Sequence, residues 1–315
     1  MATSNEPVST SAGSGAALTA GIGCYLIWGV VPLAFQLLGR MGVGPWEILA
    51  HRSLWAVPTA LGFVLLAGQG GQARAAFRNP AVIRWLALSS LLIGTNWVIF
   101  IWAVNSGRVL ETSLGYYINP LLSMAAGALL FRERIDRIGA AAIALAAVGV
   151  VLQAVALGHL PVISLALAVS FCGYGIVRKH VAADAQTGLL VECLFLAAPG
   201  LAYVLWLQHA GASHLGASPA ATAWLIACGP ITAVPLLLFG WAARRVPLSA
   251  MGFMQFIAPT MTFVMGILEG ELFTPARAVS FLFIWSGAAV FAVGAWRRTR
   301  SLGRAPRLAE TAPAE

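Results

Sequence analysis

Four ionisable side chains interrupt stretches of the chain that are otherwise apolar: Glu47, His51, Arg52 and Glu192. Glu47 and His51 are one helical turn apart, so they would share a helix face. Arg52 points elsewhere, and we expect its partner on another helix. A fixed guanidinium in apolar surroundings could bind a carboxylate or phosphate of a substrate. The alternative is a structural ion pair that fixes how two helices pack.

Glu192 is the second candidate for chemistry. It aligns with His51 when the chain is compared with itself so that Pro58 falls on Pro199. Because ionisable groups in apolar segments often line pathways, Glu192 or His51 could take up and release a proton during a working cycle. A salt bridge between Glu192 and Arg52 is the alternative, and the sequence leaves both open.

A further set of polar and aromatic residues could line a cavity for a small amphipathic ligand. Its members are Trp28, Asn96, Trp102, Tyr116, Tyr117, Asn119, Tyr174 and Gln255. Ordinary packing and hydrogen bonding between helices explains each of them equally well when it is taken alone. Residues 116–119 precede Pro120, and Gln255 precedes Pro259, so we expect the cavity where these two segments meet.

The composition shows which elements must position these residues. The chain has 315 residues, of which 59% are hydrophobic and 10% are charged. A soluble domain carries about a quarter charged residues, so a water-soluble enzyme and a disordered or fibrous chain are excluded. The net charge of +8 could indicate a nucleic-acid partner. We expect none, because the basic residues cluster between apolar runs, as they do beside membrane spans.

The apolar runs predict an all-α integral membrane protein with ten transmembrane helices, since each run is about 20 residues long. The predicted spans are 17–38, 45–67, 82–104, 109–131, 138–157, 160–178, 187–207, 220–242, 248–268 and 277–296. A barrel is disfavoured because its strands would alternate between apolar and polar residues.

The distribution of basic residues predicts the orientation. Only Arg40, Arg108 and Arg277 fall on the loops opposite the N-terminus, and nearly all the others fall on its side. Both termini are therefore expected in the cytoplasm. Residues 1–16 are predicted to be a disordered tail, and residues 297–315 a basic cytoplasmic tail.

The two halves of the chain, 17–157 and 158–296, resemble each other at an offset of about 140 residues. F-I-W-A-V-N at 100–105 matches F-G-W-A-A-R at 239–244, and W-A-V-P at 55–58 matches L-A-A-P at 196–199. Because each half has five spans, the second enters the membrane from the opposite side, which makes the repeats inverted. Matched prolines in such repeats are candidate hinges, although membrane helices also tolerate proline for structural reasons. The candidates are Pro58, Pro120, Pro199 and Pro259.

Several motifs together resemble a known family. They are E-I-L-A-H-R at 47–52, N-W-V-I-F-I-W-A-V-N at 96–105, L-E-T-S-L-G-Y-Y-I-N-P-L at 110–121, Y-G-I-V-R-K at 174–179, A-Q-T-G at 185–188 and G-F-M-Q-F-I-A-P-T at 252–260. They are similar to the RarD group of the EamA-type transporters, in the drug/metabolite transporter superfamily. The resemblance covers residues 17–298 and implies two EamA repeats in a bacterial inner membrane. Most relatives with assigned roles export amino acids, metabolites or drugs.

We therefore expect a secondary transporter that exports a small organic metabolite or drug-like solute. A passive facilitator or channel is the nearest alternative, and an intramembrane enzyme that uses His51 and Glu192 is a second. The enzyme is disfavoured because H-E-x-x-H and G-x-S-x-G motifs are absent from the sequence. We expect no cofactor or metal, and protons are a candidate coupling ion. The fifth and tenth spans suit contact with lipid or with a second copy in a homodimer.

Overall fold

The computed structural model describes residues 11–106, 108–157, 159–268 and 275–302, and within these ranges the chain is helical and contains no strand. The helices of this described part run in the following order: α1 (Ser11–Arg40), α2 (Pro45–Leu66), α3 (Gly70–Arg78), α4 (Pro80–Asn105), α5 (Val109–Leu130), α6 (Arg137–Leu157), α7 (Val162–His180), α8 (Ala185–His209), α9 (Pro219–Ala243), α10 (Leu248–Gln255), α11 (Ile257–Leu268) and α12 (Pro275–Leu302).

All ten predicted spans correspond to helices, which confirms the all-α class. Seven helices in the described residues are long and apolar enough to cross a membrane on their own. Residues 114–130 of α5 and 278–294 of α12 are shorter apolar stretches. Large apolar side chains such as Leu91, Val151 and Leu282 point away from the protein interior and are 65%, 57% and 64% exposed, as expected for helices that a bilayer covers.

The ninth predicted span, 248–268, differs from the other spans because two helices replace one. α10 ends at Gln255, and α11 begins at Ile257. Pro259 lies four residues after Gln255, so it has no N–H for the Gln255 carbonyl and its ring crowds that carbonyl. Pro120 occupies the matching place, yet α5 continues through it. The two repeats therefore differ at their matched prolines.

Three further features differ from the prediction: both ends of the helical region and one additional short helix. Residues 11–16 were expected in a disordered tail but belong to α1, and residues 297–302 were expected in the basic tail but belong to α12. Arginine is a good helix former, so the positive charges at the end of α12 do not stop the helix. The rest of both predicted tails, residues 1–10 and 303–315, lies outside the described residues.

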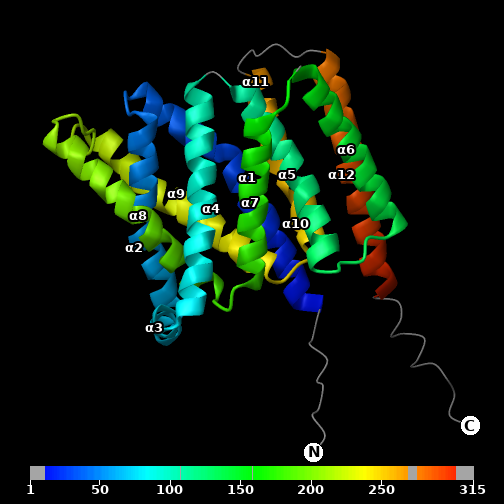
Figure 1. The fold of residues 1–315 in the computed structure, drawn as a ribbon, viewed down its shortest axis with the longest axis horizontal. Coiled ribbons are helices and arrows are strands. Elements are labelled where there is room, and N and C mark those ends of the chain that lie inside the picture. Colours follow the sequence, from blue (N-terminus) through cyan, green and yellow to red (C-terminus); the bar gives the residue numbers. More distant parts are fainter. Residues whose placement is uncertain (1–10, 107, 158, 269–274, 303–315) are drawn as a thin grey trace, which may run out of the picture.

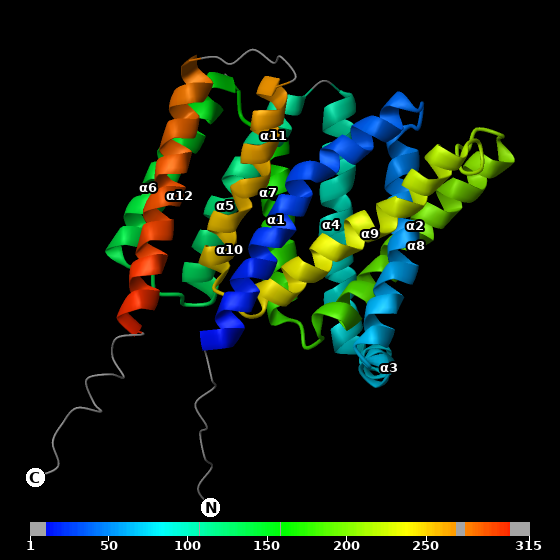
Figure 2. The same ribbon diagram turned by 180° about the vertical axis from the view of Figure 1, so that it is seen from behind.

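The third difference is α3, a short helix where a simple loop was expected. Ala73 and Ala76 are buried on one face, while Arg74 and Arg78 are exposed on the other. A search for long apolar runs misses such a helix because it is too short and too polar to span. α3 lies at the end of the bundle where α1 begins and α12 ends (Figure 2). We call this the terminal end, and the opposite one the distal end.

The packing of the helices shows the inverted repeat. α1 packs on α9 and α11, and its counterpart α7 packs on α4 and α5. α2 packs on α9 as its counterpart α8 packs on α4. The pairs α2–α8, α5–α10 and α6–α12 each join a helix to its own counterpart. Two five-helix repeats related by a twofold axis produce this pattern, because the axis exchanges the members of each pair.

α6 and α12 form one edge of the molecule (Figure 1). They pack closely, since a Cβ atom on Gly149 would lie 2.6 Å from the Ser280 carbonyl oxygen, and one on Gly287 would lie 2.6 Å from that of Ala142. Small residues allow this approach of two backbones. The face of α6 that was expected to meet lipid or a second copy is therefore partly covered by α12 of the same chain.

Candidate functional site

Arg52 lies in the second turn of α2, where three other helices meet it. Its guanidinium carbon is 3.9 Å from the ring centroid of Trp97 on α4 and 5.3 Å from that of Phe35 on α1. Its Nε donates a hydrogen bond to the Thr232 hydroxyl on α9 at 3.3 Å. The expected partner on another helix is thus an aromatic ring and a hydroxyl. The side chain of Arg52 remains partly exposed, and that of Tyr116 on α5 lies within electrostatic range of it.

Glu192 does not pair with Arg52, so that alternative is wrong. Its Oε1 lies 3.3 Å from Nη1 of Arg178 on α7 and also accepts a short hydrogen bond from the Ser89 hydroxyl on α4. The Tyr174 hydroxyl donates to Oε2 at 3.5 Å. Arg178 is 0% exposed and Glu192 is 2% exposed. Each of these two buried charges therefore depends on the other, and the pair links α7 to α8.

Arg178 is the main residue that the sequence reasoning misplaced, because it was counted as a loop anchor at the end of a span. α7 and α8 form an antiparallel hairpin with a short connection, and this hairpin brings Arg178 beside Glu192. The guanidinium also donates to the Ala185 carbonyl at 3.1 Å. A Cβ atom on Gly188 or Gly240 would overlap it. A buried carboxylate such as Glu192 normally pairs with a cation, and the neighbouring helix of the hairpin is where that cation should have been sought.

Glu47 has a partner that the sequence did not indicate. Its Oε1 accepts from the backbone N–H of His214 at 2.7 Å, and its Oε2 lies 2.8 Å from His214 Nδ1. His51 is farther away, 4.0 Å from the carboxylate, and its Nδ1 accepts from Trp55 Nε1 at 3.2 Å. His51 Nε2 is buried without a hydrogen-bond partner. Glu47 therefore fastens the α8–α9 connection to α2 at the distal end.

Aromatic rings surround the centre of the bundle beside Glu192. Trp28 lies 5.5 Å from Phe171, and Tyr174 stacks on Phe239 at 5.4 Å between ring centroids. The Tyr25 hydroxyl and the Gln255 side-chain oxygen are each buried without a hydrogen-bond partner in the described structure. The predicted residues Trp28, Tyr174 and Gln255 are thus brought to one region, together with Tyr25, Phe171 and Phe239.

The remaining predicted residues have other surroundings. Asn96 donates to the Leu167 carbonyl at 2.9 Å and so joins α4 to α7. Asn119 accepts from Ser123 within α5 at 3.4 Å. Tyr117 packs on Phe281 with ring centroids 5.3 Å apart. Trp102 is 47% exposed and lies 5.5 Å from the guanidinium of Arg108, so the structure does not bring it to either cluster.

The four matched prolines fall into two kinds of place. Pro58 on α2 and Pro199 on α8 are exposed, while Pro120 is buried and Pro259 is partly buried. A Cβ atom on Gly252 would lie 2.8 Å from the Pro120 carbonyl oxygen, so α5 and α10 nearly touch at these positions.

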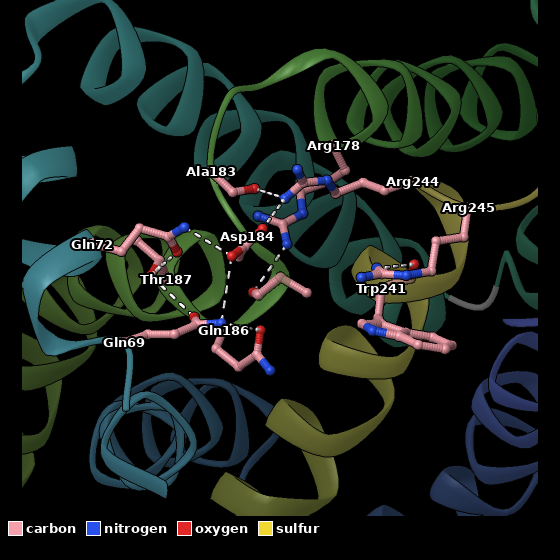
Figure 3. A network of polar contacts seen from close by, with 11 residues as sticks. Gln69, Gln72, Arg178, Ala183, Asp184, Gln186, Thr187, Trp241, Arg244 and Arg245 are labelled. Carbon is pink, nitrogen blue, oxygen red and sulfur yellow. Dashed lines mark hydrogen bonds and ion pairs between the residues drawn. The ribbon is translucent and has the colours of Figure 1, made fainter. Parts of the chain in front are cut away.

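A polar network ties the first half of the chain to the second at the terminal end (Figure 3). Gln72 on α3 donates to Asp184 Oδ2 at 2.8 Å and accepts from Thr187 on α8 at 2.9 Å. Arg244, after α9, lies 3.2 Å from Asp184 Oδ1 and also bonds the Ala183 carbonyl. Four elements therefore meet around Asp184: α3 from the first half, and the α7–α8 connection, the start of α8 and the end of α9 from the second half.

Glu133 makes a second tie at this end. It lies between α5 and α6, and it accepts from the backbone N–H of Leu248 at 2.6 Å and of Ser249 at 3.0 Å. Lys179 lies 3.2 Å from the same carboxylate. Burial raises the pKa of Glu133, but these hydrogen bonds and the Lys179 charge outweigh burial, so the pKa lies below its ordinary value of 4.5. The carboxylate thus holds the first turn of α10.

The sites around Arg52 and Glu192 occupy equivalent positions in the two repeats. Arg52 on α2 bonds a hydroxyl on α9, and Glu192 on α8 bonds a hydroxyl on α4. α2 and α8 are counterparts, as are α9 and α4. One site lies toward the distal end and the other toward the terminal end. The same scaffold therefore carries a positive group in one half and a buried carboxylate in the other.

No group of three or more His, Cys, Asp or Glu side chains in the described residues could hold a metal ion. The four cysteines are buried and unpaired in the described structure, as expected for packing residues.

This arrangement defines a class: an α-helical membrane protein with two inverted five-helix repeats and polar groups at the repeat interface. The EamA-like transporter family matches residues 15–155. An uncharacterized transporter of Vibrio cholerae is 38% identical, over 90% of this chain and 94% of its own length. Protein RarD of Escherichia coli K12 is 40% identical, over 87% of this chain and 93% of its own length. The chain belongs to the EamA-like transporter family, in its RarD group.

A solved crystal structure of another protein has the same fold. It superposes with a TM-score of 0.68 at 18% sequence identity and covers 90% of this chain and 98% of its own. The family and the relatives indicate a multi-pass membrane transporter of the drug/metabolite type rather than an enzyme.

Proposed function

We propose that this protein is a secondary carrier of the bacterial inner membrane that exports a small organic metabolite or drug-like solute by alternating access. The solute site would lie at the interface of the two repeats, between Arg52 on the distal side and Glu192 on the terminal side. Both termini would face the cytoplasm, in keeping with the excess of basic residues at the terminal end.

The observation that carries this proposal is the interlocked packing of the repeats. α1 and α7 each cross into the opposite half and pack on its third and fourth spans. When two near-equivalent halves hold each other in this way, a rocking motion can open one end while it closes the other. Channels such as the aquaporins also contain inverted repeats, so the kinetics of transport distinguish a carrier from a pore.

The two ends of the bundle differ in a manner that fits one state of such a cycle. At the terminal end, Asp184 and Glu133 tie elements of both halves together. Nearer the distal end, the side chain of Arg52 is partly exposed. We infer that this conformation is closed toward the cytoplasm and has its site accessible from the outer side.

Protons are our candidate for the coupling ion. Glu192 is buried against Arg178, and the unpartnered Nε2 of His51 is buried one turn from Glu47. A carboxylate or imidazole in such a place changes its interactions when it gains a proton. A protonated Glu192 would release Arg178, and the α7–α8 hairpin could then shift.

Metabolite profiling of cells that overproduce the protein tests the proposal. The growth medium should gain one or a few small solutes relative to cells with an empty vector, and the cells should be depleted of them. Proteoliposomes should then move these solutes with saturable, pH-dependent kinetics. Flux that never saturates would favour the facilitator. A solute recovered in altered chemical form would favour an enzyme. A medium of unchanged composition would contradict export.

A further inference from the structure

The surroundings of Arg52 lack a counter-charge. In the described part of the chain, the carboxylates of Glu111, Glu133, Asp184 and Glu192 each pair with an arginine or lysine, and that of Glu47 pairs with His214. No carboxylate among these residues lies within salt-bridge distance of Arg52. A cation roughly 10 Å along a membrane helix normally has a partner of opposite sign. Among the described residues, Arg52 has no such partner.

The geometry of the guanidinium shows which part of it is free. Trp97 covers one face at 3.9 Å, and Nε is used by Thr232. The two terminal nitrogens, Nη1 and Nη2, make no hydrogen bond within the described residues. A guanidinium edge with two parallel donors matches the two oxygens of a carboxylate. Stacking on Trp97 would hold the edge in a fixed orientation for that contact.

The charge of the site favours a carboxylate over a phosphate group. Arg52 is the only cation among the described residues that lies at this junction of α1, α2, α4 and α9. One positive charge matches the single negative charge of a carboxylate, whereas a phosphate dianion would leave one negative charge unmatched. The rings of Phe35 and Trp97 flank the guanidinium and would contact an apolar part of the same solute.

We propose that the transported solute carries a carboxylate, that Arg52 binds this group in a bidentate manner, and that Thr232 and Trp97 position the guanidinium. This inference rests on the proposed function and narrows it to one substrate class. The two repeats would then have different roles. The charge that recognises the solute lies in α2 of the first repeat, and the buried ion pair lies in the second repeat.

The test combines export with binding. Media from cells that produce the wild type, Arg52→Gln, Arg52→Lys or Arg245→Gln are separated by anion exchange at neutral pH, and the exported solutes are identified. Arg245 is the matched control, because it stacks on Trp241 at 4.3 Å but is exposed at the terminal end. Each purified protein is then heated in detergent with carboxylic acids, with the methyl esters of the same acids, and with inorganic phosphate.

We expect the identified solutes to carry a carboxylate, and we expect Arg52→Gln to reduce their export by about tenfold or more, the loss expected when a charge-assisted hydrogen bond is removed. Arg52→Lys should be intermediate, and Arg245→Gln should match the wild type. Acids, but not their esters, should raise the unfolding temperature of the wild type and of Arg245→Gln, and they should leave that of Arg52→Gln unchanged. Melting without ligand shows whether each variant is folded.

Different results separate the two proposals. If the exported solutes carry no carboxylate, or if folded Arg52→Gln exports them normally, the carboxylate inference is overturned and the carrier stands. Stabilisation by esters as strong as by acids, stabilisation by no acid, or stabilisation by phosphate alone would also overturn it. If no solute is exported by the wild type, the proposed function fails, and this inference fails with it.

Discussion

The guanidinium of Arg178 lies 3.3 Å from the carboxylate of Glu192, and neither group is reached by solvent. This pair joins α7 to α8, and the Ser89 hydroxyl adds α4 from the other repeat. Because both charges are withdrawn from water, each depends on the other for its stability. The pair therefore has a structural consequence whether or not it takes part in coupling.

Removal of one partner should cost far more than removal of both. Arg178→Met leaves the Glu192 charge buried alone, and the expected loss is about 3–5 kcal/mol of unfolding free energy. The double variant Arg178→Met with Glu192→Leu should recover most of this loss. Thermal melting of the purified proteins in detergent measures the difference. Equal destabilisation of the single and double variants would show that the ion pair is not what holds the hairpin.

The glycines around Arg178 should also be sensitive to substitution, although less so than the arginine itself. A methyl group from Gly188→Ala or Gly240→Ala would overlap the guanidinium, which is fully buried and hydrogen-bonded to Glu192 and to the Ala185 carbonyl. We expect each change to lower the unfolding free energy by about 1–3 kcal/mol. Gly62→Ala in α2 is the matched control, since a Cβ atom there meets nothing within 4 Å. It should be neutral or slightly stabilising, and a control that loses as much as the test variants would contradict the explanation.

The tie at Glu133 predicts a pH dependence at the terminal end. Its pKa is lowered in the folded protein, so its contribution to stability is present above the ordinary value of 4.5 and disappears as the pH falls below that value. The melting temperature of the wild type should therefore fall on acidification through this range. Glu133→Gln should start lower at neutral pH and show a flatter acid limb. Parallel pH profiles for the two proteins would rule out this role for Glu133.

Much of the fold follows from the sequence. Apolar runs and their basic flanks reflect the bilayer that the helices cross, and the internal offset reflects a repeated structural unit. The break between α10 and α11 could not be assigned, since Pro120 and Pro259 look alike and only the packing decides which one interrupts a helix. Arg52 was found because it lies deep in an apolar run. Arg178 was missed because it lies close to a helix end, where an arginine usually anchors the loop. The contact of His214 with Glu47 joins residues far apart in the chain, so no local sequence pattern predicts it.

Proton coupling makes a separate prediction. Replacement of His51 and Glu192 by Gln in one protein should abolish the pH dependence of flux, because neither position could then gain or lose a proton. Proteoliposomes with an imposed pH gradient provide the measurement, and exchange of solute without a gradient serves as the control for a folded carrier. A doubly substituted protein with full, pH-dependent transport would remove both residues from the coupling mechanism.

Alternating access is the central claim, and the most direct test is a pair of distances measured by electron spin resonance. One pair of labels, at Arg74 on α3 and Ala182 before α8, spans the terminal-end network, and another pair, at Ser106 after α4 and Ala217 before α9, spans the two halves on the distal side. All four positions are exposed, and the four buried native cysteines would first be replaced. When the exported solute is added to the protein, the terminal-end distance should lengthen while the distal distance shortens. Distances that stay fixed, or that lengthen together, would contradict the account.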